Sequence, residues 1–368
     1  MPEVKLVNVT KRYGEIVAND HINLTIKDKE YVSVIGPSGC GKTTLIKNIA
    51  GIIEPDEGEI YIGGRLVNKV PIEDREIGYV FQNIALFPHM TVWDNITYGP
   101  RVKGYPPEET ESLAREMIEM IKVAARADAY PDELSGGTQQ KTAVARALMT
   151  RSKLLLLDEP LGALDLKVRA ALRYELRRIV KDLGLTALHV THDQEEAMSI
   201  SDRVVVMRKG RIVESGEPLK LYMHPKNIFT ANFVGEANFL EGKVERIMRE
   251  GSIIDLGDGL KIMTRSRDKG IKVGDRVVTA FRPEFAVLGK REGVNTLSGD
   301  IMNIVYSGSL VRLHVELPND NRVIIKKALR FDEPLPRIGE KVTICVPPEN
   351  VLMYPYPKRG LRRELSLE

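Results

Sequence analysis

Residues 36–43 read GPSGCGKT and decide the fold of the N-terminal part of the chain. They follow the apolar, β-branched run YVSVI (31–35) and lead into TTLIKNIAGI (43–52), which has the composition of a helix. This strand, loop and helix context is the one that the pattern GxxxxGK[ST] requires. Its glycines let successive backbone N–H groups surround an anion, and a helix N-terminus contributes about half a positive charge. We therefore predict a phosphate-binding loop formed by Gly36, Pro37, Ser38, Gly39, Cys40, Gly41, Lys42, Thr43 and Thr44.

Two side chains of this loop carry its chemistry. Lys42 presents an ammonium that can reach the β- and γ-phosphates of a nucleotide, and the Thr43 hydroxyl suits the ligand shell of Mg²⁺. A glycine-rich turn with an exposed lysine is the alternative interpretation, but the flanking strand and helix favour a nucleotide. The sequence therefore predicts a nucleotide bound together with Mg²⁺.

A pair of acids follows the apolar run LLLL (154–157), which is typical of a central strand covered on both faces. Asp158 and Glu159 emerge where this run ends, at the edge where open α/β sheets bind ligands. Asp158 is suited to hold Mg²⁺. Glu159 points to the other side, because strand side chains alternate, and can polarise an attacking water. This pair favours hydrolysis, although two solvated turn acids are the alternative.

The order of strand-like and helix-like stretches predicts the architecture. The two alternate up to about residue 215, with helices expected at 113–124 and 165–183 and a hairpin at 204–213. Lys42 and Asp158 are 116 positions apart, which leaves room for an inserted helical subdomain at about 85–150. After about residue 236, turn signals separate short β-rich runs. We predict an α/β P-loop domain at 1–235 and a small all-β barrel of five to seven strands at 236–368, with a frayed end from Lys358.

Composition excludes several classes of protein. The 368 residues hold 54 Lys and Arg against 51 Asp and Glu, so the net charge of +3 indicates no particular partner. The two cysteines, Cys40 and Cys345, suggest no disulfide and favour a reducing cytosol, with Cys345 a small buried hydrophobe. The sequence shows neither the apolar core of a signal peptide nor a stretch of about 18 apolar residues. Any role at a membrane is therefore expected to be peripheral.

A second glycine motif, LSGGTQQK (134–141), points to a family. Ser135, Gly136 and Gly137 offer a hydroxyl and two unobstructed N–H groups at the start of a helix, which suits an anion. By itself the triplet is more typical of a capping turn. Combined in this order with the loop at 36–44 and the acids at 158–159, it makes residues 3 to about 235 resemble the ATP-binding subunit of ABC transporters.

The resemblance implies a role for several other residues. Tyr13 looks like the aromatic residue that stacks on adenine, and Gln82 looks like the glutamine that contacts Mg²⁺ and the nucleophilic water. His192 matches the switch histidine that reaches the γ-phosphate, and LGALD (161–165) matches the loop where two subunits meet. Taken singly, Tyr13 could be an ordinary strand residue and His192 a surface imidazole. The implied set is catalytic Glu159, His192, Gln82 and Lys42, with Thr43, Gln82 and Asp158 at Mg²⁺.

The resemblance also implies partners. ATP held by residues 36–44 of one subunit would be closed over by Ser135 and Gly137 of a second copy, in a head-to-tail homodimer. Two transmembrane permease subunits and, indirectly, an extracytoplasmic solute-binding protein would complete a complex at the cytoplasmic face of the membrane. The apolar residues that follow Gln82 are either core or a surface that receives a permease helix; they are Phe87, Met90, Val92 and Trp93.

The second glycine motif departs from the usual import-type form, LSGGQQQR, at Thr138 and Lys141. A lysine cannot reproduce the planar fork of an arginine, so hydrogen bonding and salt bridging beside the motif are expected to differ. Ser135, Gly136 and Gly137 are intact, so the contact with phosphate is expected to remain.

The β-rich extension, with FRPE at 281–284, resembles the OB-like regulatory (oligobinding) domain of importers for sugars, polyamines, ferric iron or oxyanions. Length and layout favour sugars, with polyamines the main alternative. An exporter ATPase would lack the extension. A cassette ATPase acting on nucleic acid would need a basic, aromatic-lined barrel face, whereas aromatic residues are 6% of the chain. We therefore predict no nucleic-acid partner.

Overall fold

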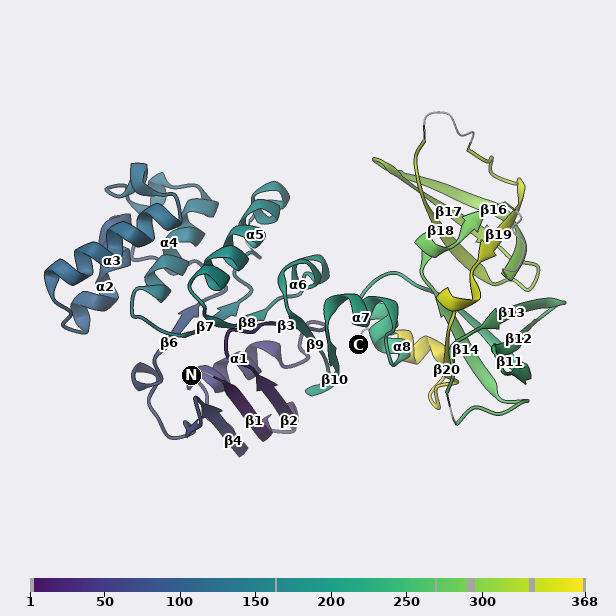
Figure 1. The fold of residues 1–368 in the computed structure, drawn as a ribbon, viewed down its shortest axis with the longest axis horizontal. Helices are drawn as coiled ribbons and strands as arrows, with labels where there is room; N and C mark the ends of the chain where they lie inside the picture. The colour runs from purple at the N-terminus through teal and green to yellow at the C-terminus, as the bar shows by residue number, and fades with distance from the viewer. Residues whose placement is uncertain (1–2, 163, 269, 290–294, 331–334, 367–368) are drawn as a thin grey trace. The chain divides into compact units, whose positions relative to one another are not determined.

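A computed structural model describes residues 3–162, 164–268, 270–289, 295–330 and 335–366 (Figure 1). The chain divides into two compact units, Met1–Leu219 and Lys220–Glu368. The first unit contains both helices and strands, and the second consists mainly of strands. The division falls before the boundary at 235/236 that the sequence predicted.

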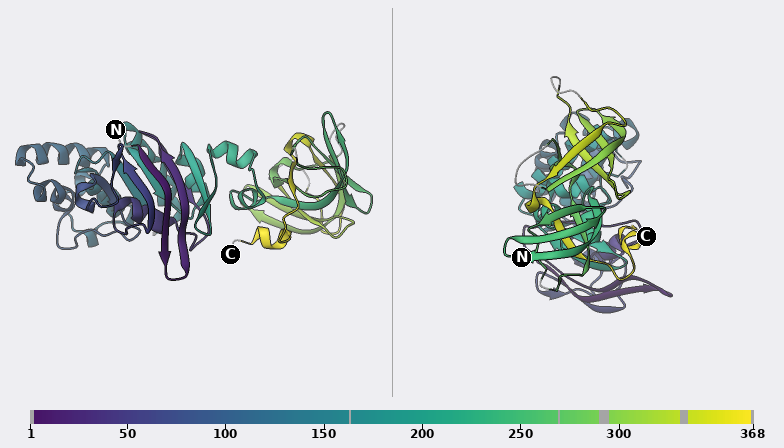
Figure 2. Two further views of the ribbon diagram at one scale, coloured as in Figure 1. Left: turned by 90° about the horizontal axis from the view of Figure 1, so that it is seen from below. Right: turned by 90° about the vertical axis from the view of Figure 1, so that its right-hand side faces the viewer.

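Two sheets form the frame of the first unit. A six-stranded sheet has the order β10-β9-β3-β8-β7-β6, in which β9 and β10 pair antiparallel and the other neighbours pair in parallel. A four-stranded antiparallel sheet has the order β2-β1-β4-β5, and its β1–β2 hairpin is the long purple pair in Figure 2. The strands are β1 (Val4–Tyr13), β2 (Ile16–Ile26), β3 (Tyr31–Ile35), β4 (Glu57–Ile62), β5 (Arg65–Leu66), β6 (Ile77–Val80), β7 (Leu154–Asp158), β8 (Thr186–Val190), β9 (Arg203–Arg208) and β10 (Arg211–Gly216).

Helices cover both faces of the parallel sheet. One helix, α1, shares a hydrophobic core with strands of both sheets and therefore lies between them. The opposite face of the parallel sheet packs against α5 and the helical subdomain that contains α2, α3 and α4. The helices are α1 (Lys42–Ala50), α2 (Val92–Val102), α3 (Pro107–Met120), α4 (Gly136–Leu148), α5 (Leu166–Asp182), α6 (Gln194–Ile200) and, across the division, α7 (Pro218–Met223); single 3-10 turns are η1 (Ile72–Asp74), η2 (Ala124–Arg126) and η3 (Pro131–Glu133).

The two predicted central strands are buried at every residue, as β3 and β7. Side chains alternate along β7: Leu156 joins the core on the α1 side, and Leu155 and Leu157 join the core on the α5 side. Because protein covers both faces of β7, neither face favours a polar side chain. This explains why residues 154–157 are all leucine.

Of the two helices predicted above, the one at 165–183 is confirmed, and the one at 113–124 is wrong at its C-terminal end. Asp165 caps α5 by accepting hydrogen bonds from the N–H groups of Lys167 and Val168, and Gly184 follows the helix with a φ of +61°. The helix predicted at 113–124 is wrong beyond Met120. Lys122 has a φ of +59°, which an α-helix does not allow, so the apolar spacing continues into a separate 3-10 turn.

The second unit consists of two five-stranded antiparallel sheets, β13-β12-β11-β14-β20 and β15-β19-β16-β17-β18. Both sheets contribute side chains to a single hydrophobic core. The all-β prediction is confirmed, but the expected five to seven strands were too few, since the described residues form ten. Tight hairpins at residues 249–250 (Arg-Glu) and 308–309 (Gly-Ser) add strands beyond the expected number; the Gly-Ser pair is a hairpin signal that the prediction of five to seven strands did not use. The elements are α8 (Ile228–Phe233), β11 (Asn238–Met248), β12 (Gly251–Gly257), β13 (Leu260–Thr264), β14 (Arg276–Phe281), η4 (Pro283–Phe285), β15 (Val287–Leu288), β16 (Asn295–Ser307), β17 (Leu310–Glu316), β18 (Arg322–Ala328), β19 (Lys341–Val346), η5 (Pro348–Asn350), β20 (Leu352–Pro355) and α9 (Leu361–Leu365).

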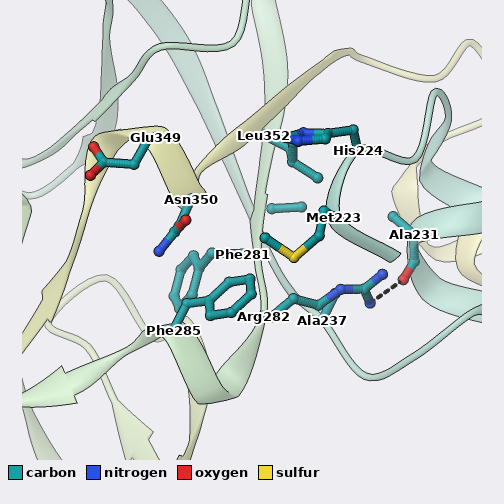
Figure 3. A pocket seen from close by; sticks show the side chains of 11 residues that line it. Met223, His224, Ala231, Ala237, Phe281, Arg282, Phe285, Glu349, Asn350 and Leu352 are labelled. Carbon is teal, nitrogen blue, oxygen red and sulfur yellow. Dashed lines mark hydrogen bonds between the residues drawn. The ribbon is translucent and has the colours of Figure 1, made fainter. Parts of the chain in front are cut away.

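The arginine of the FRPE sequence explains the early division. Arg282 is buried, and its guanidinium donates hydrogen bonds to the carbonyl groups of Tyr222, Ala231, Gly235 and Glu236; the bond to Ala231 is drawn in Figure 3. These contacts attach residues 222–236 to β14, which belongs to the second unit. The arginine therefore acts as a structural anchor beside the small pocket in that figure.

The predicted fraying of the C-terminus is wrong for residues up to 366. Leu361 is buried, and Asn232 donates a hydrogen bond of 3.0 Å to the carbonyl oxygen of Leu365, so α9 is attached to α8. Residues 367–368 lie outside the described part of the chain. Cys345 is fully buried, as predicted. In the part of the chain that the structure describes, no helix is both long and apolar enough to cross a membrane.

A buried polar network links Tyr31, at the start of β3, with residues at and just after the carboxyl end of β8. The hydroxyl of Tyr31 lies 3.0 Å from Nδ1 of His189, whose Nε2 lies 3.4 Å from Glu196. Glu196 in turn accepts a hydrogen bond of 2.6 Å from Thr191. All four side chains are at most 2% exposed. The network therefore joins the neighbouring strands β3 and β8 to α6.

We expect His189 to make folding depend on acidity. Burial lowers the pKa of this imidazole below its ordinary 6.5, so the unfolded chain takes up the proton more readily than the folded chain. The stability that neutral His189 provides is present above about pH 6.5 and is lost as the pH falls, by at most about 1.4 kcal/mol per pH unit for one proton. Urea unfolding of the wild type and of His189→Gln across this range measures the effect. The variant should show a shallower slope, and equal slopes would contradict the assignment.

Candidate active site

The loop at 36–44 joins the end of β3 to the start of α1 and lies close to neighbouring backbone. Gly41 has a φ of +100°, and a Cβ at this position would lie 2.0 Å from the carbonyl oxygen of Ala18. A Cβ on Gly36 would lie 2.4 Å from the carbonyl oxygen of Met207. Glycine is thus required at both positions by packing. The other loop residues differ in exposure: Cys40 is buried, Pro37 and Thr44 are half-buried, and Ser38 and Gly39 are exposed.

Alanine at Gly41 is expected to destabilise the fold far more than alanine at Gly39. Both positions have positive φ, which costs an alanine about 1–2 kcal/mol, but a Cβ on Gly39 meets no atom within 4 Å. Gly41→Ala adds the clash with Ala18, so we expect it to lose at least about 2 kcal/mol more than Gly39→Ala. Chemical denaturation of both variants gives the comparison. Equal losses would show that the close approach to Ala18 relaxes without cost.

The start of α1 and the side chain of Lys42 create a positive centre within the loop. No side chain caps α1, and its first turn holds no acidic residue. The Lys42 ammonium donates hydrogen bonds to the carbonyl oxygens of Gly36 (2.8 Å) and Pro37 (3.0 Å), and the residue is 6% exposed. None of the ion pairs in the described ranges includes Lys42. A buried cation without a counter-ion is costly, so the arrangement suits an anionic ligand.

Asp158 lies at the end of β7, opposite the loop. It is 3% exposed and accepts hydrogen bonds from the hydroxyl groups of Thr43 (3.4 Å) and Tyr79 (3.1 Å). Burial raises the pKa of its carboxyl group, against the opposing effects of the Tyr79 hydrogen bond and the Lys47 charge. A buried carboxylate beside a hydroxyl is a hard oxygen donor set, and a cation would offset its desolvation. The donor set of Thr43 and Asp158 therefore fits Mg²⁺.

Three further predicted residues meet at one carboxylate oxygen. Glu159 Oε2 accepts a hydrogen bond of 2.9 Å from Gln82 Nε2 and lies 3.2 Å from His192 Nδ1. These side chains follow the carboxyl ends of β6, β7 and β8, which are adjacent in the sheet. The Glu159 backbone has a φ of +47°, and its N–H donates to the carbonyl of Val190 at 2.8 Å. The parallel sheet thus assembles an acid, an amide and an imidazole from three separate segments.

The second glycine motif lies at the start of α4, in the helical subdomain. Ser135 caps α4 by accepting a hydrogen bond of 3.3 Å from the N–H of Thr138. Gly136 and Gly137 pack against the side chains of Leu164 and Val168, where a Cβ would lie at 3.1 and 2.8 Å. No hydrogen bond or ion pair among the described residues joins this motif to residues 36–44. The structure therefore does not bring the two glycine motifs together within one chain.

Both unusual residues of this motif have local partners. The Thr138 hydroxyl lies 2.9 Å from the Ser135 hydroxyl, so it adds a contact at the cap. Lys141 forms an ion pair of 2.8 Å with Glu175 of α5. One ammonium contact thus replaces the fork that an arginine would present.

The remaining predicted positions are less closely tied to the site. Tyr13 ends β1 and is 47% exposed, with the Lys11 ammonium 5.7 Å from its ring centre. Of the apolar residues after Gln82, Val92 is fully part of the core, which removes it as a surface residue. Trp93 packs partly against the same core, and Phe87 and Met90 are half-buried. Ala163 of the LGALD sequence lies outside the described residues.

Sequence reasoning missed Tyr79, which holds the second oxygen of Asp158. The residue lies on β6, paired in register with Leu156 of β7. Its position one residue before the end of the strand in GYVFQN is compatible with such a contact. The pairing of β6 with β7 was not predictable, however, because 75 positions separate Tyr79 from Leu154.

Comparison with known proteins identifies two families along the chain. The family model described as ABC transporter matches residues 19–162, and the TOBE domain model matches residues 279–353. The spermidine/putrescine import ATP-binding protein PotA of Rubrobacter xylanophilus is 40% identical over 344 residues, which cover 93% of this chain and 91% of that protein. PotA of Haemophilus influenzae is 38% identical over 349 residues, covering 93% and 94%.

Solved structures match the first unit. A dimeric ATP-binding cassette in a post-hydrolysis state, bound to ADP and Pi, is 35% identical and covers 58% of this chain and 98% of its own, with a TM-score of 0.53. The protein cbiO1 of Clostridium perfringens, part of an ABC transporter complex, is 28% identical and covers 59% and 89%, with a TM-score of 0.56.

The fold and the site together define an ATPase of the ATP-binding cassette class, with a P-loop domain and an OB-like TOBE domain. Its activity is ATP hydrolysis coupled to transport. More particularly, the chain belongs to the family of ATP-binding subunits of ABC importers.

Proposed function

We propose that this subunit hydrolyses ATP to drive the uptake of a polyamine of the spermidine or putrescine type. The two relatives described above, which this chain matches over 91% and 94% of their own length, are spermidine/putrescine import proteins. They do not support the preference for sugars drawn from the length and layout of the chain. The solute does not touch this subunit, so the proposal on the solute rests on similarity along the whole chain.

The observation that carries the ATPase site is the buried Lys42 ammonium, whose hydrogen-bond partners among the described residues are two carbonyl oxygens and, at 4.0 Å, the Cys40 sulfur, with no carboxylate. The β- and γ-phosphates of ATP would replace these weak partners with full negative charge. Mg²⁺, when bound by Thr43 and Asp158, would neutralise charge that develops on the phosphates. Tyr13 is 47% exposed, and the face of its ring would stack on the adenine ring.

Glu159 is the general base of this proposal. Gln82 and His192 hold one of its oxygens, so the other oxygen remains to accept a proton from an attacking water. His192 is 53% exposed, which leaves its imidazole accessible to the γ-phosphate. Gln82 lies at the start of the helical subdomain, so it would couple binding of the phosphate to the position of that subdomain.

A second copy would complete the site. Ser135 and Gly137 do not reach the loop at 36–44 of their own chain, and a related cassette is dimeric with ADP and Pi. We therefore place these residues on the ATP of a partner subunit. Closure on ATP and opening after hydrolysis would then follow the gain and loss of the γ-phosphate. Two permease subunits and a solute-binding protein would couple this cycle to uptake at the cytoplasmic face of the membrane.

The test is solute-stimulated ATP hydrolysis by the assembled complex. The subunit, its permeases and its binding protein would be reconstituted in lipid vesicles with Mg²⁺ and ATP. Spermidine or putrescine should stimulate hydrolysis, and maltose should not. Stimulation by maltose alone would overturn the polyamine proposal, and no hydrolysis with any solute would overturn the assignment of the site.

A further inference from the structure

Arg169, near the start of α5, contacts the loops that follow two of the site strands. Its Nη2 donates hydrogen bonds to the carbonyl oxygens of Gly162 (3.2 Å) and Leu164 (2.9 Å). Its Nη1 lies 3.5 Å from Oδ2 of Asp193. The side chain is 18% exposed, so these contacts are partly shielded from solvent. One planar guanidinium thus joins the loop after β7 to the loop after β8.

Each contact of Arg169 lies close to a residue of the site. Gly162 donates its N–H to the carbonyl oxygen of Glu159 at 3.1 Å, so the first contact holds the turn in which Glu159 sits. Asp193 directly follows His192 and caps α6 by accepting a hydrogen bond of 3.0 Å from the N–H of Glu196. Asp193 is therefore held through both carboxylate oxygens, one by α6 and the other by Arg169.

The hydrogen bond between Glu159 and His192 spans the same two loops that Arg169 contacts. The two residues leave adjacent strands, and the backbone bond from Glu159 to Val190 joins the ends of those strands. Beyond the strands, Arg169 adds a second connection between the two loops through its contacts with Gly162, Leu164 and Asp193. Because a displacement of about 1 Å can cost 10²-fold in rate, such a connection matters for a general base.

We propose that Arg169 is a positioning residue that sets the separation between Glu159 and His192. It acts through the carbonyl groups of Gly162 and Leu164 and through the carboxylate of Asp193, without contacting the nucleotide. This inference rests on the proposed role of Glu159 as general base. On this proposal the site requires the planar, forked guanidinium of arginine and not only its positive charge.

A simple structural ion pair between α5 and α6 is the competing explanation, and the chain contains a natural comparison. Arg173, one turn after Arg169, forms an ion pair of 3.1 Å with Glu195, but none of the described hydrogen bonds joins it to the loops after β7 and β8. Asp193→Asn and Glu195→Gln therefore remove equivalent charges from neighbouring pairs. Asparagine remains a good helix cap, so Asp193→Asn preserves the start of α6.

Steady-state ATP hydrolysis by the full-length chain, measured over a range of ATP concentrations, tests the proposal. Arg169→Ala should lower kcat by about tenfold or more, with the KM for ATP within about twofold of wild type, because binding is not affected. Arg169→Lys should recover only part of the loss, and Asp193→Asn should show a smaller loss than Arg169→Ala. Glu195→Gln should match wild type. Thermal unfolding of each variant checks the fold, and Arg169→Lys carries the test if Arg169→Ala does not fold.

The Glu159→Gln background separates positioning from a structural effect. If Arg169 acts through Glu159, Arg169→Ala should cause no further loss once the base has been removed. A full additional loss in this background, or equal losses from Asp193→Asn and Glu195→Gln, would overturn the inference while leaving the proposed function intact. Unchanged turnover in Glu159→Gln alone would instead overturn the general base, and with it this inference.

Discussion

Glu159→Gln is expected to reduce ATP turnover by about 10²–10⁴-fold, the usual contribution of a general base. Glutamine has the same shape but cannot accept the proton from water at neutral pH. Its amide can keep contacts with Gln82 and His192, so ATP binding should persist. With hydrolysis blocked, a dimer closed on ATP should become long-lived. Turnover assays and size-exclusion chromatography with Mg²⁺ and ATP measure the two effects.

The control for this variant is Glu111→Gln on the exposed surface of α3. Glu111 pairs with Arg115 one turn away and does not contact the site, so its loss should leave hydrolysis unchanged. An ATPase rate in Glu159→Gln close to that of Glu111→Gln would remove Glu159 from the role of base. A loss of ATP binding in Glu159→Gln would instead indicate that the carboxylate organises the nucleotide site.

Lys42→Ala is expected to weaken nucleotide binding and to lower hydrolysis by about 10²–10³-fold, or about 2.7–4 kcal/mol of charge stabilisation. The buried ammonium is the positive charge that the loop directs at its own centre. Its removal leaves the backbone N–H groups and the helix dipole as the remaining attraction for phosphate. Equilibrium binding of a fluorescent ATP analogue and steady-state hydrolysis measure the two losses separately.

Lys103→Ala provides the matched control, because Lys103 is an exposed lysine at the end of α2. It removes the same net charge without touching the loop. Similar affinities for the analogue in Lys42→Ala and Lys103→Ala would contradict the assignment of the loop. Because Lys42 makes its hydrogen bonds within the loop, thermal unfolding of Lys42→Ala should accompany the assay.

Much of the fold and site could be predicted because the deciding signals are local. The loop at 36–44 depends on glycine at fixed spacing, and β7 depends on an apolar run that both layers of the domain must bury. The Asp165 cap and Gly184 mark the ends of α5 by backbone geometry alone. Each of these features can be read from fewer than about 20 consecutive residues.

One error was local: α3 ends because the backbone has a positive φ at Lys122, which the apolar spacing does not show. Elsewhere distant residues decide the outcome: the division between the units depends on Arg282 binding carbonyl groups up to 60 positions away. The C-terminal helix is ordered because Leu361 is buried with residues of α8 and β14. The solute preference failed for another reason: it was drawn from chain length and layout, which do not encode the chemistry of a solute.

The sequence by itself determined the phosphate loop, the acids at the end of β7 and the order of the motifs, because short-range chain geometry specifies each of them. Only the tertiary structure decided that Gln82 and His192 both contact one carboxylate oxygen of Glu159. It also decided that Arg169 links the loops that follow β7 and β8. These residues come from separate strands and helices of the chain. Their distances are set by parallel strand pairing and by packing of the layers, which no local pattern encodes.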